Sequence, residues 1–197
     1  MPLPKKETIQ MTESEYLDFD DSDEDKWEFF NGVVYAMAGG TPEHNEIKDN
    51  LAQTLKNQID ELDKKCSLFS SDQRTKSHIS KNDNQYHYPD IVIFCRGEYT
   101  REGTTLINPS LIIEVLSEST EANDRGVKWS INKKNPVLKY YILVSQKKRQ
   151  IEVFYRLSLF EWKYSSIENG EKLYLGEMGL ELDFEKIYKG EFAGKVK

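Results

Sequence analysis

The chain lacks any run of about 18 apolar residues, so the sequence predicts no transmembrane helix and no membrane partner. The N-terminal residues MPLPKKETIQM also lack the apolar core of a signal peptide, which favours a cytoplasmic protein over a secreted one. No repeat or low-complexity segment interrupts the 197 residues, a length that suits one domain. We expect a single domain over residues 1–197, with its core at about 10–160 and peripheral strands and a loose end at 160–197.

Cysteine is scarce, because Cys66 and Cys95 are the only two in the chain and cannot form a disulfide framework. Cys95 lies in an apolar run, which favours a buried, reduced thiol. Histidine is scarce too, with three in all. His78 and His87, taken with Cys95, lack the paired spacing of zinc ligands, which argues against a zinc-dependent hydrolase.

Positive charge is also in short supply, since 27 Lys and Arg face 34 Asp and Glu, a net charge of -7. This balance argues against tight non-specific binding to nucleic acid, which depends on cations that neutralise phosphates. It does not exclude binding through one face. Basic residues gather at Lys133-Lys134 and at Lys147-Lys148-Arg149, where solvated turns are the simpler interpretation.

What is present indicates an ordered domain, because hydrophobic residues make up 38% and aromatic residues 12%. Thr12 and Glu15 form a capping-box pattern for a helix to about Phe19, followed by an acidic loop at 18–25. Asn31-Gly32 between two apolar runs predicts a hairpin. Thr41-Pro42 then begins an amphipathic helix at about 42–64.

Strand-like segments follow this helix. Two of them, 86–95 and 110–116, have apolar runs without alternation, which predicts central strands covered on both faces. A short helix at about 121–134 ends at Pro136. This order of elements predicts an α/β domain with a mixed sheet. The expected strands are at 68–75, 86–95, 110–116, 140–145 and 151–155.

Two carboxylates stand out against this apolar background. Asp90 directly precedes the run Ile91–Cys95, and Glu114 lies inside the run Leu111–Leu116. Burying an ionised carboxylate is costly unless a metal, a cation or a functional pocket compensates it. If these segments are neighbouring strands, both carboxylates can meet at one end of the sheet.

A pair of carboxylates suits Mg²⁺, and the carbonyl of Val115 could add a third oxygen ligand. Such an ion could polarise a phosphodiester and orient an attacking water. Lys128, on the following helix, could be the cation near the water or the phosphate, and Glu28 at the hairpin could add a carboxylate. Structural alternatives remain for each residue: a turn cap for Asp90, an internal ion pair for Glu114, and solvent exposure for the other two.

Five segments in a fixed order make the sequence resemble the Uma family, a bacterial family of the PD-(D/E)XK nuclease superfamily. The resemblance spans about residues 10–160. It implies a restriction-endonuclease-like core, in which helices flank a central mixed β-sheet, and metal-dependent hydrolysis of phosphodiester bonds. The segments are WEFFNGVVYAMAGGTPEH, YHYPDIVIF, PSLIIEVLSEST, NDRGVK and KYYILV.

Within this resemblance, Glu28 matches the acidic residue before the hairpin glycine, and Asp90 and Glu114 match the two metal carboxylates. His44 matches a histidine at the start of a helix and is an auxiliary candidate, although a local hydrogen bond is the commoner role at such a position. The superfamily lysine, two residues after the second carboxylate, is replaced here by Leu116. The resemblance implies that Lys128 takes over its role.

The sequence also departs from the family pattern in the helix and strand that follow Glu114. An aromatic residue is common four positions after Lys128, where this chain has Asn132. The other departures are Pro136, Lys139 and the pair Val144-Ser145.

Two hypotheses from different classes follow. The first is a nuclease that uses Mg²⁺ or Mn²⁺ and acts on nucleic acid, with DNA favoured over RNA. A homodimer is compatible with this hypothesis. The second is a catalytically inactive module with the nuclease fold that binds a partner. The carboxylates with Lys128 favour the first, whereas the acidic net charge and the departures after Glu114 favour the second.

Overall fold

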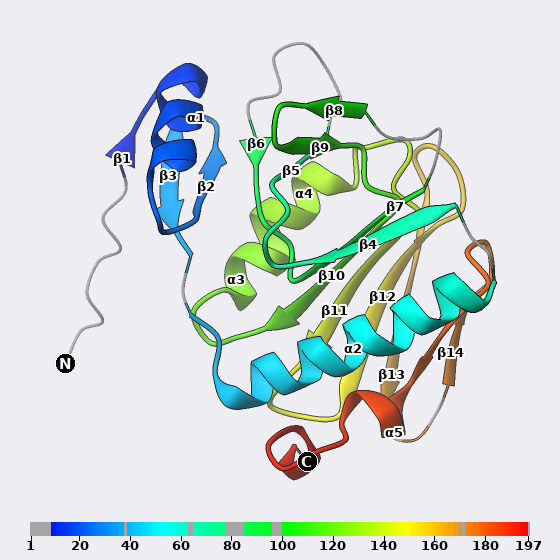
Figure 1. Cartoon of the computed structure of the whole chain (residues 1–197). Coiled ribbons are helices and arrows are strands. Elements are labelled where there is room, and N and C mark those ends of the chain that lie inside the picture. Colours follow the sequence, from blue (N-terminus) through cyan, green and yellow to red (C-terminus); the bar gives the residue numbers. More distant parts are fainter. Residues whose placement is uncertain are drawn as a thin grey trace.

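A computed structural model describes residues 9–37, 39–62, 65–77, 85–95, 100–168, 170 and 172–196. His78 lies outside these residues. A six-stranded mixed sheet forms the centre of the molecule (Figure 1). The two apolar runs predicted to be central strands, Ile91–Cys95 and Leu111–Leu116, both lie inside this sheet. All their residues are buried except the partly exposed Cys95, which confirms that both strands are covered on both faces. In spatial order the strands are β13 (Trp162–Glu168), β12 (Gln150–Arg156), β11 (Tyr140–Ser145), β10 (Leu111–Leu116), β7 (Ile91–Cys95) and β4 (Cys66–Ser70).

The direction of β10 relative to its neighbours decides where its ends lie. It runs parallel to β11, with Leu116 opposite Ser145, and antiparallel to β7, with Ile113 opposite Ile91. The C-terminal ends of β10 and β11 and the start of β7 therefore meet at one edge of the sheet. Asp90 and Glu114 lie at this edge.

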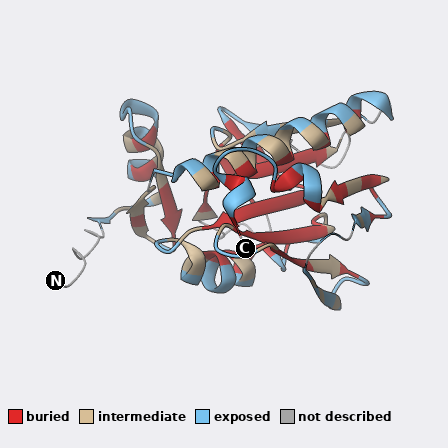
Figure 2. Ribbon diagram, turned by 90° about the horizontal axis from the view of Figure 1, so that it is seen from below, coloured by how far each residue is buried: buried red, intermediate tan, exposed pale blue. Residues whose placement is uncertain are grey.

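Helices cover the two faces of the sheet. The helix α2 (Pro42–Glu61) packs its buried residues Ile47, Leu51, Leu55 and Ile59 on one face, as its spacing predicts. On the other face lies a helical segment made of α3 (Glu121–Asn123), a π-turn (Asp124–Lys128) and α4 (Trp129–Asn132). Figure 2 shows the buried strands between these partly exposed helices. The predicted mixed α/β core is confirmed.

A smaller N-terminal sheet packs beside the core, in the order β1 (Ile9–Gln10), β3 (Val33–Ala36), β2 (Trp27–Phe30), β6 (Gln85–Tyr86). Asn31 and Gly32 adopt φ values of 51° and 88° and close the predicted hairpin β2–β3. A third sheet has the order β5 (Thr75–Lys76), β9 (Thr105–Ile107), β8 (Thr100–Glu102).

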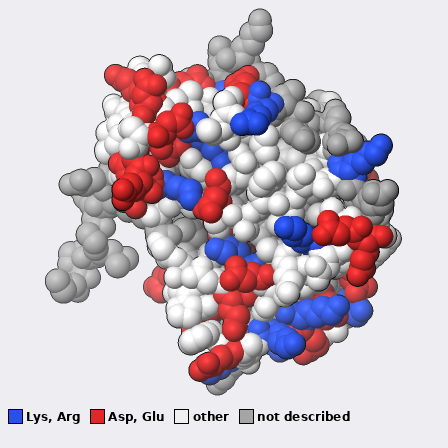
Figure 3. All heavy atoms as spheres, in the orientation of Figure 1, with Lys and Arg blue, Asp and Glu red and all other residues white. Residues whose placement is uncertain are grey.

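The first helix, α1 (Glu13–Ser22), begins with the predicted capping box but is longer than predicted. Residues 18–22 are helical instead of forming a loop. The reason is tertiary, because Asp20 is buried and accepts a hydrogen bond from Arg74 at 2.8 Å. Other acidic side chains of this region stay in solvent and gather over α1 in Figure 3.

The C-terminal part of the chain contains strands, as predicted, but its last residues do not form a loose end. It forms β14 (Lys172–Leu175), β15 (Leu180–Asp183), α5 (Phe184–Ile187) and a 3₁₀ turn (Ala193–Lys195). The Glu46 carboxylate of α2 accepts three backbone N–H groups of residues 191–193 and fixes this segment. Its buried residues join the main core: Leu175, Met178, Leu180, Leu182, Phe184, Ile187, Tyr188, Ala193 and Val196.

The expectation of a reduced Cys95 is wrong in this structure, where Cys95 forms a disulfide with Cys66. The two cysteines lie opposite each other on the adjacent antiparallel strands β7 and β4. Composition alone cannot show such a pairing, because it depends on which strands become neighbours. No helix among the described residues is long and apolar enough to cross a membrane.

Candidate active site

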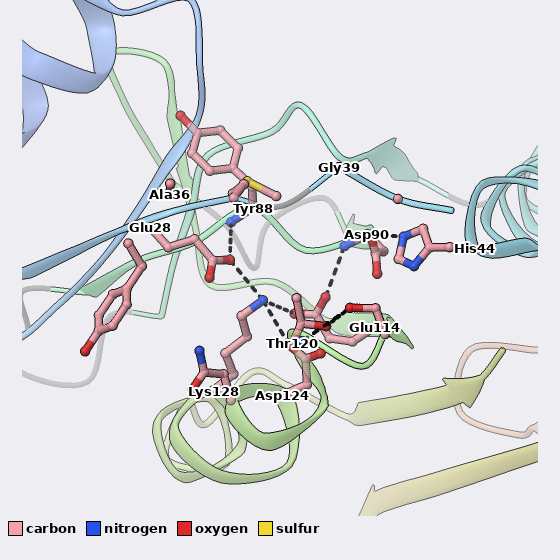
Figure 4. Close-up of a pocket in the computed structure, with 15 residues that line it drawn as sticks. Glu28, Ala36, Gly39, His44, Tyr88, Asp90, Glu114, Thr120, Asp124 and Lys128 are labelled. Carbon is pink, nitrogen blue, oxygen red and sulfur yellow. Dashed lines mark hydrogen bonds and ion pairs between the residues drawn. The ribbon is translucent and has the colours of Figure 1, made fainter. Parts of the chain in front are cut away.

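Asp90 and Glu114 approach each other at the edge of the central sheet, as their positions on successive apolar runs predict. The backbone N–H of Asp90 donates to Glu114 Oε2 at 3.3 Å, and the backbone N–H of Val115 donates to Asp90 Oδ2 at 2.8 Å. Glu114 shares its face of β10 with Ile112 and Leu116, the face covered by the α3–α4 segment. The side chain therefore points toward Lys128 (Figure 4).

Lys128 lies at the centre of the site. Its Nζ is 2.9 Å from Glu28 Oε1, 3.2 Å from Glu114 Oε1 and 3.1 Å from Asp124 Oδ1. These partners come from β2, β10 and the π-turn. All four side chains are buried, and Lys128 is 5% exposed. Figure 4 shows the ammonium group of Lys128 between the carboxylates of Glu28, Glu114 and Asp124.

His44 joins the site from the first turn of α2. Thr41 caps this helix and accepts a hydrogen bond from the His44 N–H, which places the imidazole Nε2 3.0 Å from Asp90 Oδ1. Gly40 allows this approach, since a Cβ there would lie 2.7 Å from the imidazole Cδ2. The five side chains expected at the site, those of Glu28, His44, Asp90, Glu114 and Lys128, are thus brought together in one pocket.

The electrostatics of the pocket follow from burial and from an excess of carboxylates. Burial raises the pKa of Glu28 and raises that of Glu114 well above its ordinary value, although Lys128 opposes both shifts. Burial alone would lower the pKa of Lys128, but Glu114, Glu28 and Asp124 hold it well above the ordinary value. Lys128 therefore stays a cation at neutral pH. When Asp90 is included, the pocket contains four carboxylates and one lysine. A further cation would therefore stabilise this cluster.

The donor set decides which ion would fit. Within the described ranges, no three His, Cys, Asp or Glu side chains form a ready-made metal cage, as structural zinc requires. Mg²⁺ needs fewer protein ligands, because it commonly binds one or two carboxylates and keeps several waters. Asp90 and Glu114 supply these two carboxylates.

The backbone carbonyl of Val115 is suited to be the third protein ligand of the ion. Its N–H points toward the β7 side, and the C=O of the same strand residue points the same way. If the register of β10 and β7 continues past Ile113 and Ile91, the residue opposite Val115 is Pro89, which has no N–H to donate. The residues present therefore fit Mg²⁺.

The family model described as "Putative restriction endonuclease" matches residues 13–187, which is most of the chain. The chain belongs to the Uma2 family. The match extends beyond the segment of about 10–160 on which the sequence resemblance rests, in line with the C-terminal residues that complete the core.

Two Synechocystis proteins are similar to this chain over most of their length. "Uncharacterized protein slr1290" is 31% identical, covering 96% of this chain and 94% of that protein. "Uncharacterized protein sll1609" is 29% identical, covering 82% and 90%. The fold is also that of a crystal structure from Anabaena variabilis, described as "a putative nuclease belonging to DUF820". That structure has a TM-score of 0.72 and 16% identity, and the match covers 90% of this chain and 97% of that one.

Asp124 also lies in this pocket but was not among the site residues predicted from the sequence. It is 1% exposed and contacts Lys128 one turn along the helical segment. The i, i+4 spacing of an aspartate and a lysine was the available signal, but such pairs are common on exposed helix surfaces. Ser117, Thr120 and Asn123 also line the pocket.

Asn132 does not disturb the pose of Lys128. It is fully buried, donates to the Lys128 carbonyl at 3.0 Å, and accepts from Ser77 Oγ at 2.6 Å. His87 is buried beside it, and burial with the nearby Lys128 lowers its pKa to about 3. Since Cys95 is in a disulfide and His87 faces Asn132, these two residues do not form a zinc site.

Proposed function

We propose that the protein is a Mg²⁺-dependent nuclease that hydrolyses phosphodiester bonds. The observation that supports this most strongly is the convergence of Asp90 and Glu114 beside a buried, protonated Lys128. Membership of a family described as "Putative restriction endonuclease" agrees with the reaction class. Mn²⁺ is expected to substitute, since it also prefers carboxylate and carbonyl oxygens.

In this proposal, Asp90, Glu114 and the carbonyl of Val115 hold the ion. When bound, it polarises the phosphate and favours ionisation of a water. The chain's own groups orient these ligands. His44 contacts Asp90 Oδ1, and the Asp90 and Val115 N–H groups fix the two carboxylates.

Lys128 supplies a fixed positive charge. Its raised pKa means that it donates hydrogen bonds and stabilises negative charge, and does not act as a general base. It takes the place of the superfamily lysine, because Leu116 at that position can neither donate a hydrogen bond nor carry a charge. Glu28 and Asp124 are positioning residues in this scheme, since they hold the ammonium group from two sides.

The test is cleavage of single-stranded DNA, duplex DNA and RNA with Mg²⁺ or Mn²⁺. We expect the wild type to cut at least one substrate, and Asp90→Ala and Glu114→Gln to lose this activity. Asp60→Asn is the matched control, because Asp60 is an exposed carboxylate on α2 away from the pocket. Cleavage that survives in both site variants would contradict the proposal.

The inactive binding module remains the second candidate, because three carboxylates already surround Lys128 and compete for its charge. A wild-type protein that cuts none of the substrates would favour it, provided that Mg²⁺ still raises the melting temperature through Glu114. No cleavage and no effect of Mg²⁺ would contradict the metal site itself.

A further inference from the structure

The turn between β11 and β12, residues 146–149, lies at the same sheet edge as the pocket. Ser145, the last residue of β11, is opposite Leu116, the last residue of β10, and Ser117, which follows β10, lines the pocket. The turn therefore lies at the same end of the sheet as Glu114. Figure 1 shows this yellow segment next to the N-terminal end of α2.

Side-chain contacts fix the turn in this place. Thr41 Oγ1 donates to Gln146 Oε1 at 2.8 Å, which ties the turn to the start of the helix that carries His44. Ser145 Oγ accepts the backbone N–H groups of Lys147 and Lys148 at 3.2 and 3.3 Å. The turn is thus held between the sheet and α2.

Two lysines of this turn form no direct ion pair with a described carboxylate. Lys147 and Lys148 are exposed, and Lys148 has only a longer-range electrostatic interaction with Glu152, a carboxylate that Arg125 and Tyr164 already bind. Other cations nearby are already paired: Arg149 contacts Glu185 at 2.6 Å, and Arg125 contacts Glu152 at 2.5 Å. Lys147 and Lys148 therefore present positive charge outside any direct ion pair, at the end of the sheet that carries the acidic pocket.

A polyanion approaching this pocket meets the carboxylates of Glu114, Asp90 and their neighbours, which repel it. Phosphate contacts from Lys or Arg supply most of the affinity and the register in protein–DNA complexes. We infer that Lys147 and Lys148 bind backbone phosphates of duplex DNA next to the pocket and so position the strand to be cut. This inference rests on the proposed nuclease function.

The chain contains its own control for such a charge effect. Lys133-Lys134 is also an exposed pair of lysines. It follows α4 and precedes β11, whose first residue, Tyr140, is opposite Leu111, the residue of β10 farthest from the pocket. The two lysine pairs therefore have equal charge but lie at opposite ends of the sheet.

The test measures the affinity of labelled duplex DNA for the full chain in EDTA over a range of salt concentrations. We expect the double variant Lys147→Ala/Lys148→Ala to bind about tenfold more weakly at low salt. The slope of log K against log salt should fall by about 2, one unit for each lost phosphate contact. The double variant Lys133→Ala/Lys134→Ala should match the wild type.

Equal losses in both double variants would show a diffuse effect of net charge and overturn the inference, as would no loss in either. A loss confined to RNA of the same sequence would overturn the assignment to DNA. Cleavage is measured separately with Mg²⁺. If the wild type cuts nothing, the proposed function fails, but a binding loss specific to Lys147 and Lys148 would still support a DNA-binding edge.

Discussion

Two buried cations, Arg74 and Lys128, organise the two halves of the molecule in different ways. Arg74 donates to Asp20 and Asp21 at 2.8 Å each and to the hydroxyls of Thr104 and Thr105. Its donors are spread over partners on α1 and on the strand pair beside it, and Asp21 keeps more than half of its side chain in solvent. Lys128 instead contacts three carboxylates that are all buried, and Asp90 is bound to one of them, Glu114, through its backbone N–H.

The difference distinguishes an ion cluster with balanced charges from the cluster at the proposed active site. Around Arg74 the one deeply buried carboxylate, Asp20, also accepts from the Tyr88 hydroxyl and the Trp27 N–H, so its charge is compensated. Around Lys128 the carboxylates exceed the cation, and burial raises the pKa of two of them. A fold that needed only stability would not keep such an excess. The surplus of buried carboxylates around Lys128 supports the proposed metal site.

The strongest test of this comparison replaces each cation by methionine. Lys128→Met should reduce cleavage by about two to four orders of magnitude, because a fixed charge next to the phosphate is lost. Both Lys128→Met and Arg74→Met should lower the free energy of unfolding by about 3–5 kcal/mol, since each leaves buried carboxylates unpaired. Cleavage rates per folded molecule and denaturant titrations measure the two effects.

Arg74→Met should cut at the wild-type rate when folded, and a rate loss as large as that of Lys128→Met would remove the distinction between the clusters. If Lys128→Met does not fold, Lys128→Arg is the second variant. It keeps the charge but replaces a compact ammonium group by a planar fork, so we expect it to fold and to remain impaired.

A second, smaller effect concerns the response to Mg²⁺. Glu114→Gln should leave the metal-free protein as stable as the wild type or slightly more stable, because it removes repulsion among carboxylates. It should also abolish stabilisation by Mg²⁺, which amounts to about 2.7 kcal/mol at a hundredfold excess over Kd. Asp20→Asn should do the opposite, destabilising the protein while keeping the Mg²⁺ effect. Thermal melts with and without Mg²⁺ give both readings, and an equal Mg²⁺ shift in wild type and Glu114→Gln would place the ion elsewhere.

The smallest effect is a pH dependence of stability without metal. Burial raises the folded-state pKa of Glu114 above its ordinary value of 4.5, so the folded state binds this proton more tightly than the unfolded state. The wild type should therefore lose stability relative to Glu114→Gln as the pH rises from about 4.5 through the raised pKa. Denaturant titrations of both proteins at several pH values measure the difference. A difference that stays constant with pH would contradict the raised pKa.

Local sequence signals predicted much of the fold and part of the site. Asn31-Gly32 and Thr41-Pro42 specify a turn and a helix start through their own backbone preferences, so their outcome did not depend on distant residues. Asp90 and Glu114 were found because carboxylates are rare beside apolar runs. Each of these features is contained within a few residues of sequence.

The features that were missed all depend on contacts between distant segments. Asp124 resembles any surface partner of a helical lysine until the position of Glu114 shows that this side of the helix is buried. The pairing of Cys66 with Cys95 follows from β4 lying next to β7. The C-terminal segment is ordered because Glu46 binds its backbone and the main core takes up its apolar residues.

The ion pair between Glu28 and Lys128 has a consequence for the newly made chain, because its two residues are separated by 100 positions (128 minus 28). Contacts this distant in sequence form only after a large loop closes, so they mark a slow stage of folding. A chain in which the hairpin β2–β3 has not yet docked holds Lys128 without its Glu28 partner. The proposed nuclease activity would then begin only with the completely folded protein, and its onset during refolding would report when the N-terminal hairpin docks.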